Sequence, residues 1–266
     1  MRKKSVGLTG FMFILFLCLG LFANRGGAED VVILAENDFV PFSTPEGKGL
    51  SNEIVSEAFK AVNINAKIEI FPFARLMVMV KEGQAIGGFN AVPTDDTKPD
   101  YLFGKEPIYT SHMNFFYHVE DPVVIDTEAD IATKITNQKM VVGDVVGYIY
   151  PPDYVKMKDS KAFIVESVNS DQILIKKLAA KRNKVALMTV EVANYHIQNL
   201  GVKDKIGYGK YTWEAPLFIA FSKKNPKAQH YMEQFDKGMA IIKSNGMYQK
   251  IRNFSINSGE CGNSYI

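Results

Sequence analysis

The spacing of apolar and polar residues along residues 31–89 is typical of short strands separated by amphipathic helices. Short runs with period two predict strands, and apolar residues spaced three and four apart predict helices. In the stretch 50–62, for example, Leu50, Ile54 and Ala58 fall on one helix face. The predicted elements are, in chain order, strand 31–35, helix 50–62, strand 67–71, helix 74–82 and strand 85–89. This β-α-β-α-β order favours a largely parallel sheet covered by helices.

A second block of the same kind follows a long aromatic strand at 113–119. An apolar strand at 216–222 comes after that block, and Asn225 with Pro226 marks the start of the next helix. The other predicted elements are strands 139–143, 163–165 and 185–188 and helices 170–181, 191–200 and 244–253. We therefore expect an α/β protein of two lobes, hinged on the two long strands, with the C-terminal helices packed on the first block. Ligands favour clefts between such lobes.

The first 28 residues have the pattern of a secretory signal peptide. Residues 2–4 are basic, residues 10–22 are apolar, and the small residues 26–28 form a cleavage site. The apolar run is shorter than the roughly 20 residues that a spanning helix needs. The alternative is an uncleaved membrane anchor. Cleavage predicts a mature chain of residues 29–266 outside the cytoplasm.

Removal of the leader changes the charge and the cysteine count. The whole chain of 266 residues carries a net charge of +2, but four basic residues lie in the leader. The mature chain has 27 basic and 29 acidic side chains, which gives no electrostatic footprint for nucleic acid. Only Cys261 remains, so no intramolecular disulfide is expected. The histidines have no metal-ligand spacing, and we expect neither a metal nor a cofactor.

Four stretches of the chain resemble one protein family. Residues 36–42 match an acidic-x-x-aromatic-x-Pro-Phe loop, and residues 71–83 match an aromatic-Pro-aromatic-x-Arg segment that ends in Gly. Residues 106–109 resemble a crossover between lobes, and residues 244–251 resemble a closing helix. In this order the motifs are similar to family 3 of the bacterial extracellular solute-binding proteins, the polar amino-acid type.

The resemblance implies the type II periplasmic binding fold and its division of the chain. Lobe 1 would comprise 29–115 and 217–266, and lobe 2 would comprise 116–216. The implied function is capture of a small polar solute in the periplasm and delivery to an inner-membrane ABC permease, by a monomer without catalysis. A sensor for a membrane partner is one alternative. A cyclic-acid dehydratase is another, with Glu36, Asp38 and Glu191 as its acid–base groups.

The resemblance and the cleft position together predict the ligand-binding residues. Aromatic rings would stack on the ligand, and loop residues after the strands would donate and accept hydrogen bonds. Arg75 would either hold an acidic ligand group or pair with Glu36 or Asp38. The predicted set is Glu36, Phe39, Phe73, Arg75, Asn90, Val92, Thr97, Gly147, Tyr148 and Thr189.

Two positions depart from the family pattern. Thr97 stands where the family has the Arg that binds the ligand carboxylate, and Thr189 stands where it has the Asp that binds the ammonium. These changes favour a ligand other than a plain α-amino acid. The alternative is that Lys98 and Glu191 supply the two charges from neighbouring positions. We also expect Pro151 and Pro152 to interrupt regular structure early.

Overall fold

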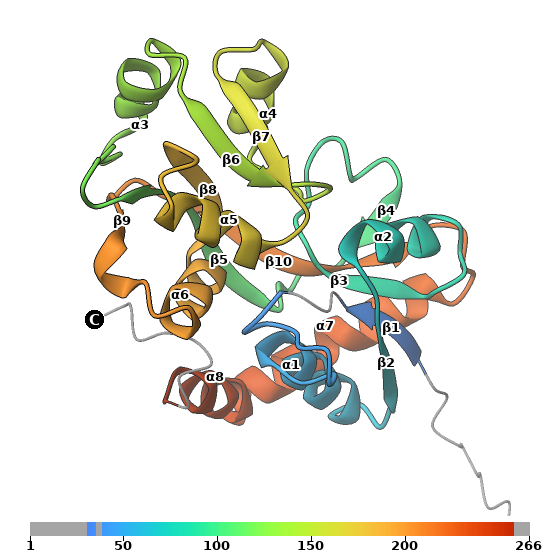
Figure 1. Ribbon diagram of the computed structural model, residues 1–266. Coiled ribbons are helices and arrows are strands. Elements are labelled where there is room, and N and C mark those ends of the chain that lie inside the picture. Colours follow the sequence, from blue (N-terminus) through green and yellow to red (C-terminus); the bar gives the residue numbers. More distant parts are fainter. Residues whose placement is uncertain (1–30, 36–38, 258–266) are drawn as a thin grey trace, which may run out of the picture.

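Ten strands form one curled mixed sheet in the computed structural model, which describes residues 31–35 and 39–257 (Figure 1). The strands are β1 Val31–Ala35, β2 Ala66–Ile70, β3 Gly87–Ala91, β4 Tyr101–Phe103, β5 Tyr109–His118, β6 Val141–Val145, β7 Ile164–Val168, β8 Val185–Thr189, β9 Ile206–Tyr208 and β10 Trp213–Ser222. The helices are α1 Leu50–Lys60, α2 Phe73–Lys81, α3 Glu128–Asp130, α4 Pro152–Asp159, α5 Asp171–Ala179, α6 Val190–Asn199, α7 Ala228–Ser244 and α8 Met247–Asn257. A π-helical turn, Ile131–Thr136, continues α3, and a 3-10 turn, Lys203–Lys205, precedes β9.

The two long strands β5 and β10 lie side by side in the middle of the sheet. The strand order is β2-β1-β3-β10-β5-β8-β6-β7, with β4 beside β10 and β9 beside β5. β1, β2 and β3 are parallel to one another, and so are β6, β7 and β8. We call β1 to β4 with α1, α2, α7 and α8 the first half, and β6 to β9 with α3 to α6 the second half. The predicted lobe boundaries, 115/116 and 216/217, fall inside β5 and β10.

Each half has its core between the sheet and its helices. In the first half α7 lies against α1, and Gly238 makes this close approach possible, because a side chain there would collide with the backbone of Ala58. The α1 face of the sheet is filled by large side chains such as Phe59 and Phe235, and α2 covers the opposite face.

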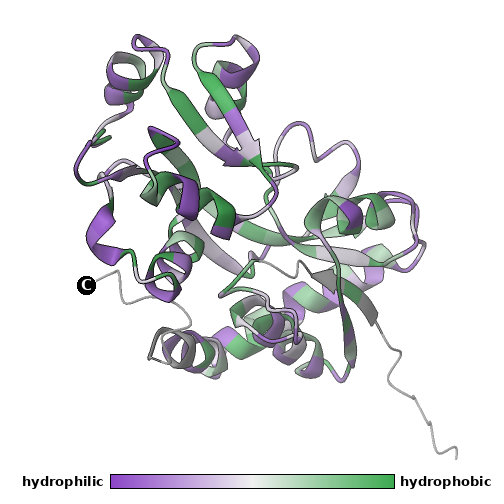
Figure 2. Ribbon diagram, viewed as in Figure 1, coloured by the Kyte–Doolittle hydropathy of each residue, from purple (hydrophilic) through white to green (hydrophobic). Residues whose placement is uncertain are grey.

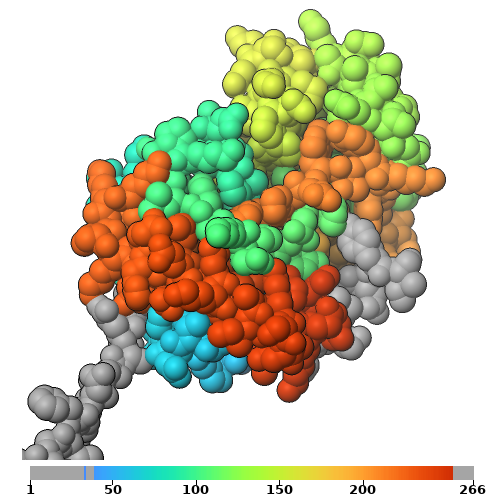
Figure 3. Space-filling view, turned by 180° about the vertical axis from the view of Figure 1, so that it is seen from behind, coloured from blue at the N-terminus to red at the C-terminus, as the bar shows by residue number. Residues whose placement is uncertain are grey.

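Apolar residues follow the strands and the inward helix faces in Figure 2, and the loops are mostly hydrophilic. From behind, α7 and α8 form a broad outer surface of the first half (Figure 3).

The sequence pattern predicts most of these elements within a few residues. The helix that was expected from Asn225 begins at Ala228 instead, because the Asn225 side chain accepts the backbone N–H of Lys227 (3.0 Å) in a preceding turn. The expected interruption at Pro151 and Pro152 is wrong. Pro152 is the first residue of α4, where a missing N–H costs no hydrogen bond.

Some sequence predictions fall outside the part of the chain that the structure describes. The signal peptide, Glu36, Asp38 and Cys261 are among them. Within residues 31–35 and 39–257, no helix is long and apolar enough to cross a membrane.

Candidate functional site

A small cleft lies where the two halves meet beside β5 and β10. Its free space is about 30 Å³, far below the several hundred Å³ of typical ligand pockets. The side chains of the cleft therefore fill it almost completely in this conformation. The lining residues are Phe39, Phe73, Asn90 and Val92 from the first half, Met113, Ala215 and Leu217 from the long strands, and Tyr148, Ile149 and Thr189 from the second half.

Three aromatic rings meet in this cleft. The Tyr148 ring stands edge-on to Phe39, with centroids 6.0 Å apart and planes at 89°. It is also edge-on to Phe73, at 6.2 Å and 77°. Phe42, which is fully buried, stacks on the far side of Phe39 at 5.1 Å. The edge-to-face arrangement is the favoured one for aromatic pairs, and it joins a ring of the second half to two rings of the first.

The loop after β6 carries Tyr148 across to the first half. The Tyr148 hydroxyl donates to Asp171 Oδ2 (2.8 Å) at the start of α5, which fixes the ring from the second half. Gly147 has a φ of +80°, and a Cβ there would lie 3.3 Å from the Ala74 Cβ of α2. The left-handed backbone and the close neighbour both favour glycine at this position.

Asn90 presents an unpaired amide to the cleft. It lies at the end of β3 with a φ of +66°, a conformation that asparagine tolerates better than most residues. Its side chain is only 6% exposed, yet neither Oδ1 nor Nδ2 has a hydrogen-bond partner. Buried amides are nearly always paired, so this group requires an explanation. A bound ligand that supplies the missing hydrogen bonds is one.

Thr189 lines the cleft from the position just before α6. It occupies the N-cap position, but its side chain makes no capping hydrogen bond. The residue is 7% exposed.

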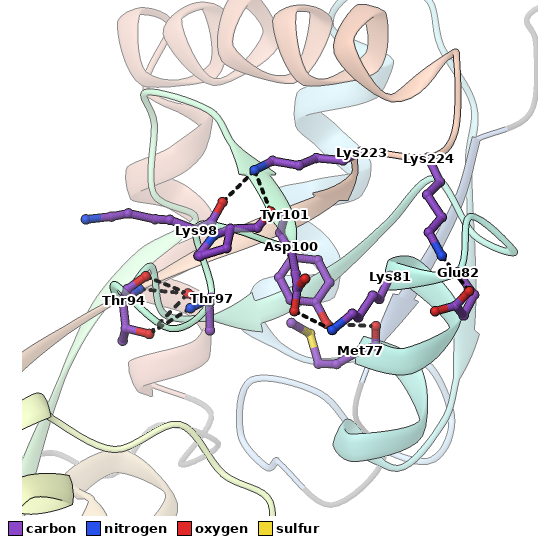
Figure 4. A network of polar contacts seen from close by, with 11 residues as sticks. Met77, Lys81, Glu82, Thr94, Thr97, Lys98, Asp100, Tyr101, Lys223 and Lys224 are labelled. Atoms are coloured by element: carbon purple, nitrogen blue, oxygen red, sulfur yellow. Dashed lines mark hydrogen bonds and ion pairs between the residues drawn. The ribbon is translucent and has the colours of Figure 1, made fainter.

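Thr97 lies in the loop that follows β3 and does not line the cleft. Its hydroxyl donates to the carbonyl of Val92 or Thr94 (both 3.2 Å) and accepts the N–H of Thr94 (2.8 Å). Figure 4 shows this closed turn beside Lys98. Thr97 therefore closes the loop that begins at Val92, and of these two residues only Val92 lines the cleft.

Neither basic residue of the prediction lines the cleft. Arg75 is exposed at the start of α2, where its guanidinium lies 4.9 Å from the centre of the Phe71 ring. The Lys98 ammonium pairs with Asp95 (3.3 Å) on the surface. The cleft thus has no cationic side chain among the described residues that line it.

Glu191 is buried behind the cleft, in the first turn of α6. It accepts hydrogen bonds from Ser111, on a short contact, and from the Tyr109 hydroxyl (3.4 Å), both on β5. Burial raises the pKa of this carboxyl, and the Ser111 hydrogen bond partly opposes the rise. Glu191 therefore links α6 to a central strand and does not face the cleft.

The structure brings together six of the ten predicted residues: Phe39, Phe73, Asn90, Val92, Tyr148 and Thr189. Gly147 is adjacent, Glu36 lies outside the described residues, and contact of any of these residues with a ligand stays a prediction. The sequence analysis did not include four other lining residues, Met113, Ile149, Ala215 and Leu217. Pairing of the two long strands would have indicated Met113 and Leu217, since Met113 lies opposite Trp213 and Leu217 opposite Tyr109. Among the described residues, no group of acidic, His or Cys side chains is arranged to hold a metal.

Solved structures match this architecture over most of the chain. An amino-acid ABC transporter substrate-binding protein from Streptococcus pneumoniae, bound to L-arginine, matches with a TM-score of 0.68, 17% identity, and coverage of 88% of this chain and 96% of that one. A histidine kinase sensor domain with similarity to periplasmic binding proteins matches with a TM-score of 0.73, 13% identity, and coverage of 86% and 96%. This chain has the fold of the periplasmic binding proteins. The predicted type II fold, two α/β lobes around a cleft, is confirmed.

A sequence relative agrees with this binding-protein fold. The arginine-binding periplasmic protein of Mannheimia haemolytica is 28% identical over 235 residues, which cover 84% of this chain and 90% of the relative. No protein-family profile matches the chain. The resemblance to extracellular solute-binding proteins is confirmed by the relative and the structures together.

Proposed function

We propose that this protein is a periplasmic solute-binding protein, which captures a small polar solute between its halves and delivers it to an inner-membrane ABC permease. The observation that carries the proposal is the buried, unpaired amide of Asn90 in the cleft between the halves. The named relative and the substrate-binding neighbours support the same role. Closure on the ligand would give the permease a distinct form to recognise.

The localisation proposal follows from the leader. We propose that the chain is exported, cleaved after Ala28 and active as a monomer in the periplasm. The relative of 28% identity is a periplasmic protein, which supports this compartment. N-terminal sequencing of the protein from a periplasmic extract should read Glu29 first. A protein that stays in the membrane fraction with an intact Met1 would contradict cleavage.

A transport assay tests the function itself. A strain that lacks this gene should lose uptake of at least one radiolabelled solute from a panel of amino acids, amides, amines and sugars. The wild-type gene should restore that uptake. Unchanged uptake of every solute in the deletion strain would overturn the transport role.

A sensor role is the second candidate, because the sensor domain of a histidine kinase matches this fold with a TM-score of 0.73. A sensor predicts unchanged uptake and a lost transcriptional response to the solute in the same deletion strain. The dehydratase alternative gains no support from the geometry. Its described carboxyl group, Glu191, is held by Ser111 and Tyr109 and does not line the cleft.

A further inference from the structure

The wall of the cleft has hydrogen-bonding groups but no basic side chain among the described residues. Its polar side chains are those of Asn90, Tyr148 and Thr189, and the rest of the lining is apolar or aromatic. Residues 36–38, which precede Phe39, are Glu, Asn and Asp and add no positive charge. A ligand carboxylate buried here would have no cationic partner, and such burial is strongly unfavourable.

The basic side chains that lie near the lining residues Phe73, Asn90 and Val92 in the sequence do not line the cleft. The guanidinium of Arg75 lies over the Phe71 ring, and the ammonium of Lys98 pairs with Asp95. Lys81, at the end of α2, pairs with Asp100 (2.6 Å), and both side chains are partly exposed (Figure 4). Because these three basic side chains do not line the cleft, the polar part of a ligand would contact neutral polar side chains of the lining.

Asn90 supplies those neutral groups in a fixed position. An asparagine amide offers one acceptor oxygen and two N–H donors. Here all of them are buried without a partner, and the backbone φ of +66° at the end of β3 sets their direction. A ligand carboxamide can donate an N–H to the Asn90 oxygen and accept an N–H from the Asn90 nitrogen. An ionised carboxylate has no donor, so it leaves the Asn90 oxygen without a hydrogen bond.

The start of α6 also favours a neutral oxygen. The free N–H groups of a helix N-terminus attract a partial negative charge, and Thr189 places this terminus at the cleft. The first turn of α6 already contains Glu191. A ligand carboxylate close to this carboxyl, with no cation beside it, is disfavoured, but a carbonyl oxygen is not.

We infer that the ligand carries no carboxylate: it presents an uncharged, amide-like edge to Asn90 and an apolar or aromatic part to the rings of Phe39, Phe73 and Tyr148. This inference rests on the proposed binding function and names the ligand class for the same cleft. It departs from the named relative, whose ligand, arginine, is an amino acid.

Calorimetric titration of residues 29–266 with matched pairs tests the inference. The pairs are nicotinamide with nicotinate and L-argininamide with L-arginine, because each pair differs only in amide against carboxylate. We expect at least one amide to bind and its acid to bind at least tenfold more weakly. An acid that binds as tightly as its amide overturns the inference, although the proposed binding function then stands.

A conservative variant tests whether Asn90 binds the amide group of the ligand. Asn90→Asp keeps the shape of the side chain and its tolerance of positive φ, but it replaces the two N–H donors with a charge. It should weaken the amide ligand at least tenfold. Asn63→Asp is the matched control, because Asn63 also has a positive φ (58°) but is exposed and does not line the cleft.

Two further outcomes would also overturn the inference. One is equal binding of the amide by wild type and Asn90→Asp. The other is binding of neither member of either pair. The uptake assay is independent of both results, so failure of the ligand class is distinguishable from failure of the transport role.

Discussion

Tyr148 is the residue on which the two halves meet. It packs against all four apolar clusters of the described structure. Its hydroxyl is bound to Asp171 in the second half while its ring contacts Phe39 and Phe73 in the first. Tyr148 therefore connects the two halves, with its polar end fixed in the second half and its ring in the cleft.

Removal of the Tyr148 hydroxyl should cost stability, because it removes the hydrogen bond to Asp171. Hydrogen bonds to charged groups contribute roughly 1.5–3 kcal/mol. We expect Tyr148→Phe to lose about 1.5 kcal/mol in the free energy of unfolding, measured by urea denaturation. Tyr208→Phe is the control, because the Tyr208 ring packs against Phe116 and none of the described hydrogen bonds involves its hydroxyl. Equal losses in both variants would contradict a role for the Asp171 contact.

At the scale of elements, periodicity predicts the strands and helices well because each buries one face against the sheet. The pattern fails where tertiary contacts decide. β4 and β9 have three residues each and exist as strands through pairing with β10 and β5. The cleft shows the same division. Asn90 and Thr189 follow predicted strands, but no local signal shows that Arg75 turns onto Phe71 or that Thr97 closes its own loop.

Two helix starts in the second half should respond differently to loss of a hydroxyl. Ser170 caps α5 by accepting the N–H of Ile173 (3.4 Å), whereas Thr189 precedes α6 without a capping bond. Ser170→Ala should lower the free energy of unfolding by about 0.5–1 kcal/mol. Thr189→Ala should change it less and weaken ligand binding instead. Thermal denaturation and ligand titration of both variants check this, and a reversed ranking in stability would refute it.

Glu191, which links α6 to β5, should make the free energy of unfolding depend on pH. Burial raises the pKa of Glu191 above its ordinary value of 4.5, so the folded state holds this proton more tightly than the unfolded state. The stabilisation is complete below about pH 4.5 and is lost as the pH rises through the folded-state pKa. Wild type should therefore lose stability relative to Glu191→Gln over this window, by at most about 1.4 kcal/mol per pH unit.

Urea denaturation at several pH values between 4 and 7 measures the difference. Glu214→Gln on β10 is the control, because Glu214 is exposed. Parallel pH profiles for wild type and Glu191→Gln would show that the buried carboxyl does not titrate in this range.

For the molecule as a whole, the small free space in the cleft predicts that a ligand enters when the halves separate. Ala74 and Gly147 lie on opposite sides of this contact, and a Cβ at 147 would lie 3.3 Å from the Ala74 Cβ. This is close to the ~3.8 Å typical of disulfides. The variant A74C/G147C, in a Cys261→Ser background, should therefore lock the halves together when oxidised.

We expect the oxidised variant to bind its ligand at least tenfold more weakly than the same protein after reduction. The single variant Gly147→Cys reports the cost of a side chain at φ +80° without the lock. Calorimetry with and without reductant measures the effect. Equal affinity in the two redox states would show that the ligand reaches its site without separation of the halves.

The position of β10 has a consequence for how the chain is made. This strand pairs with β3, β4 and β5, yet it begins only at Trp213. A growing chain that has not reached this residue lacks the strand that joins its two halves, and the helix α7 that covers α1 comes later still. The sheet that joins the two halves is therefore completed only after most of the chain has been synthesised.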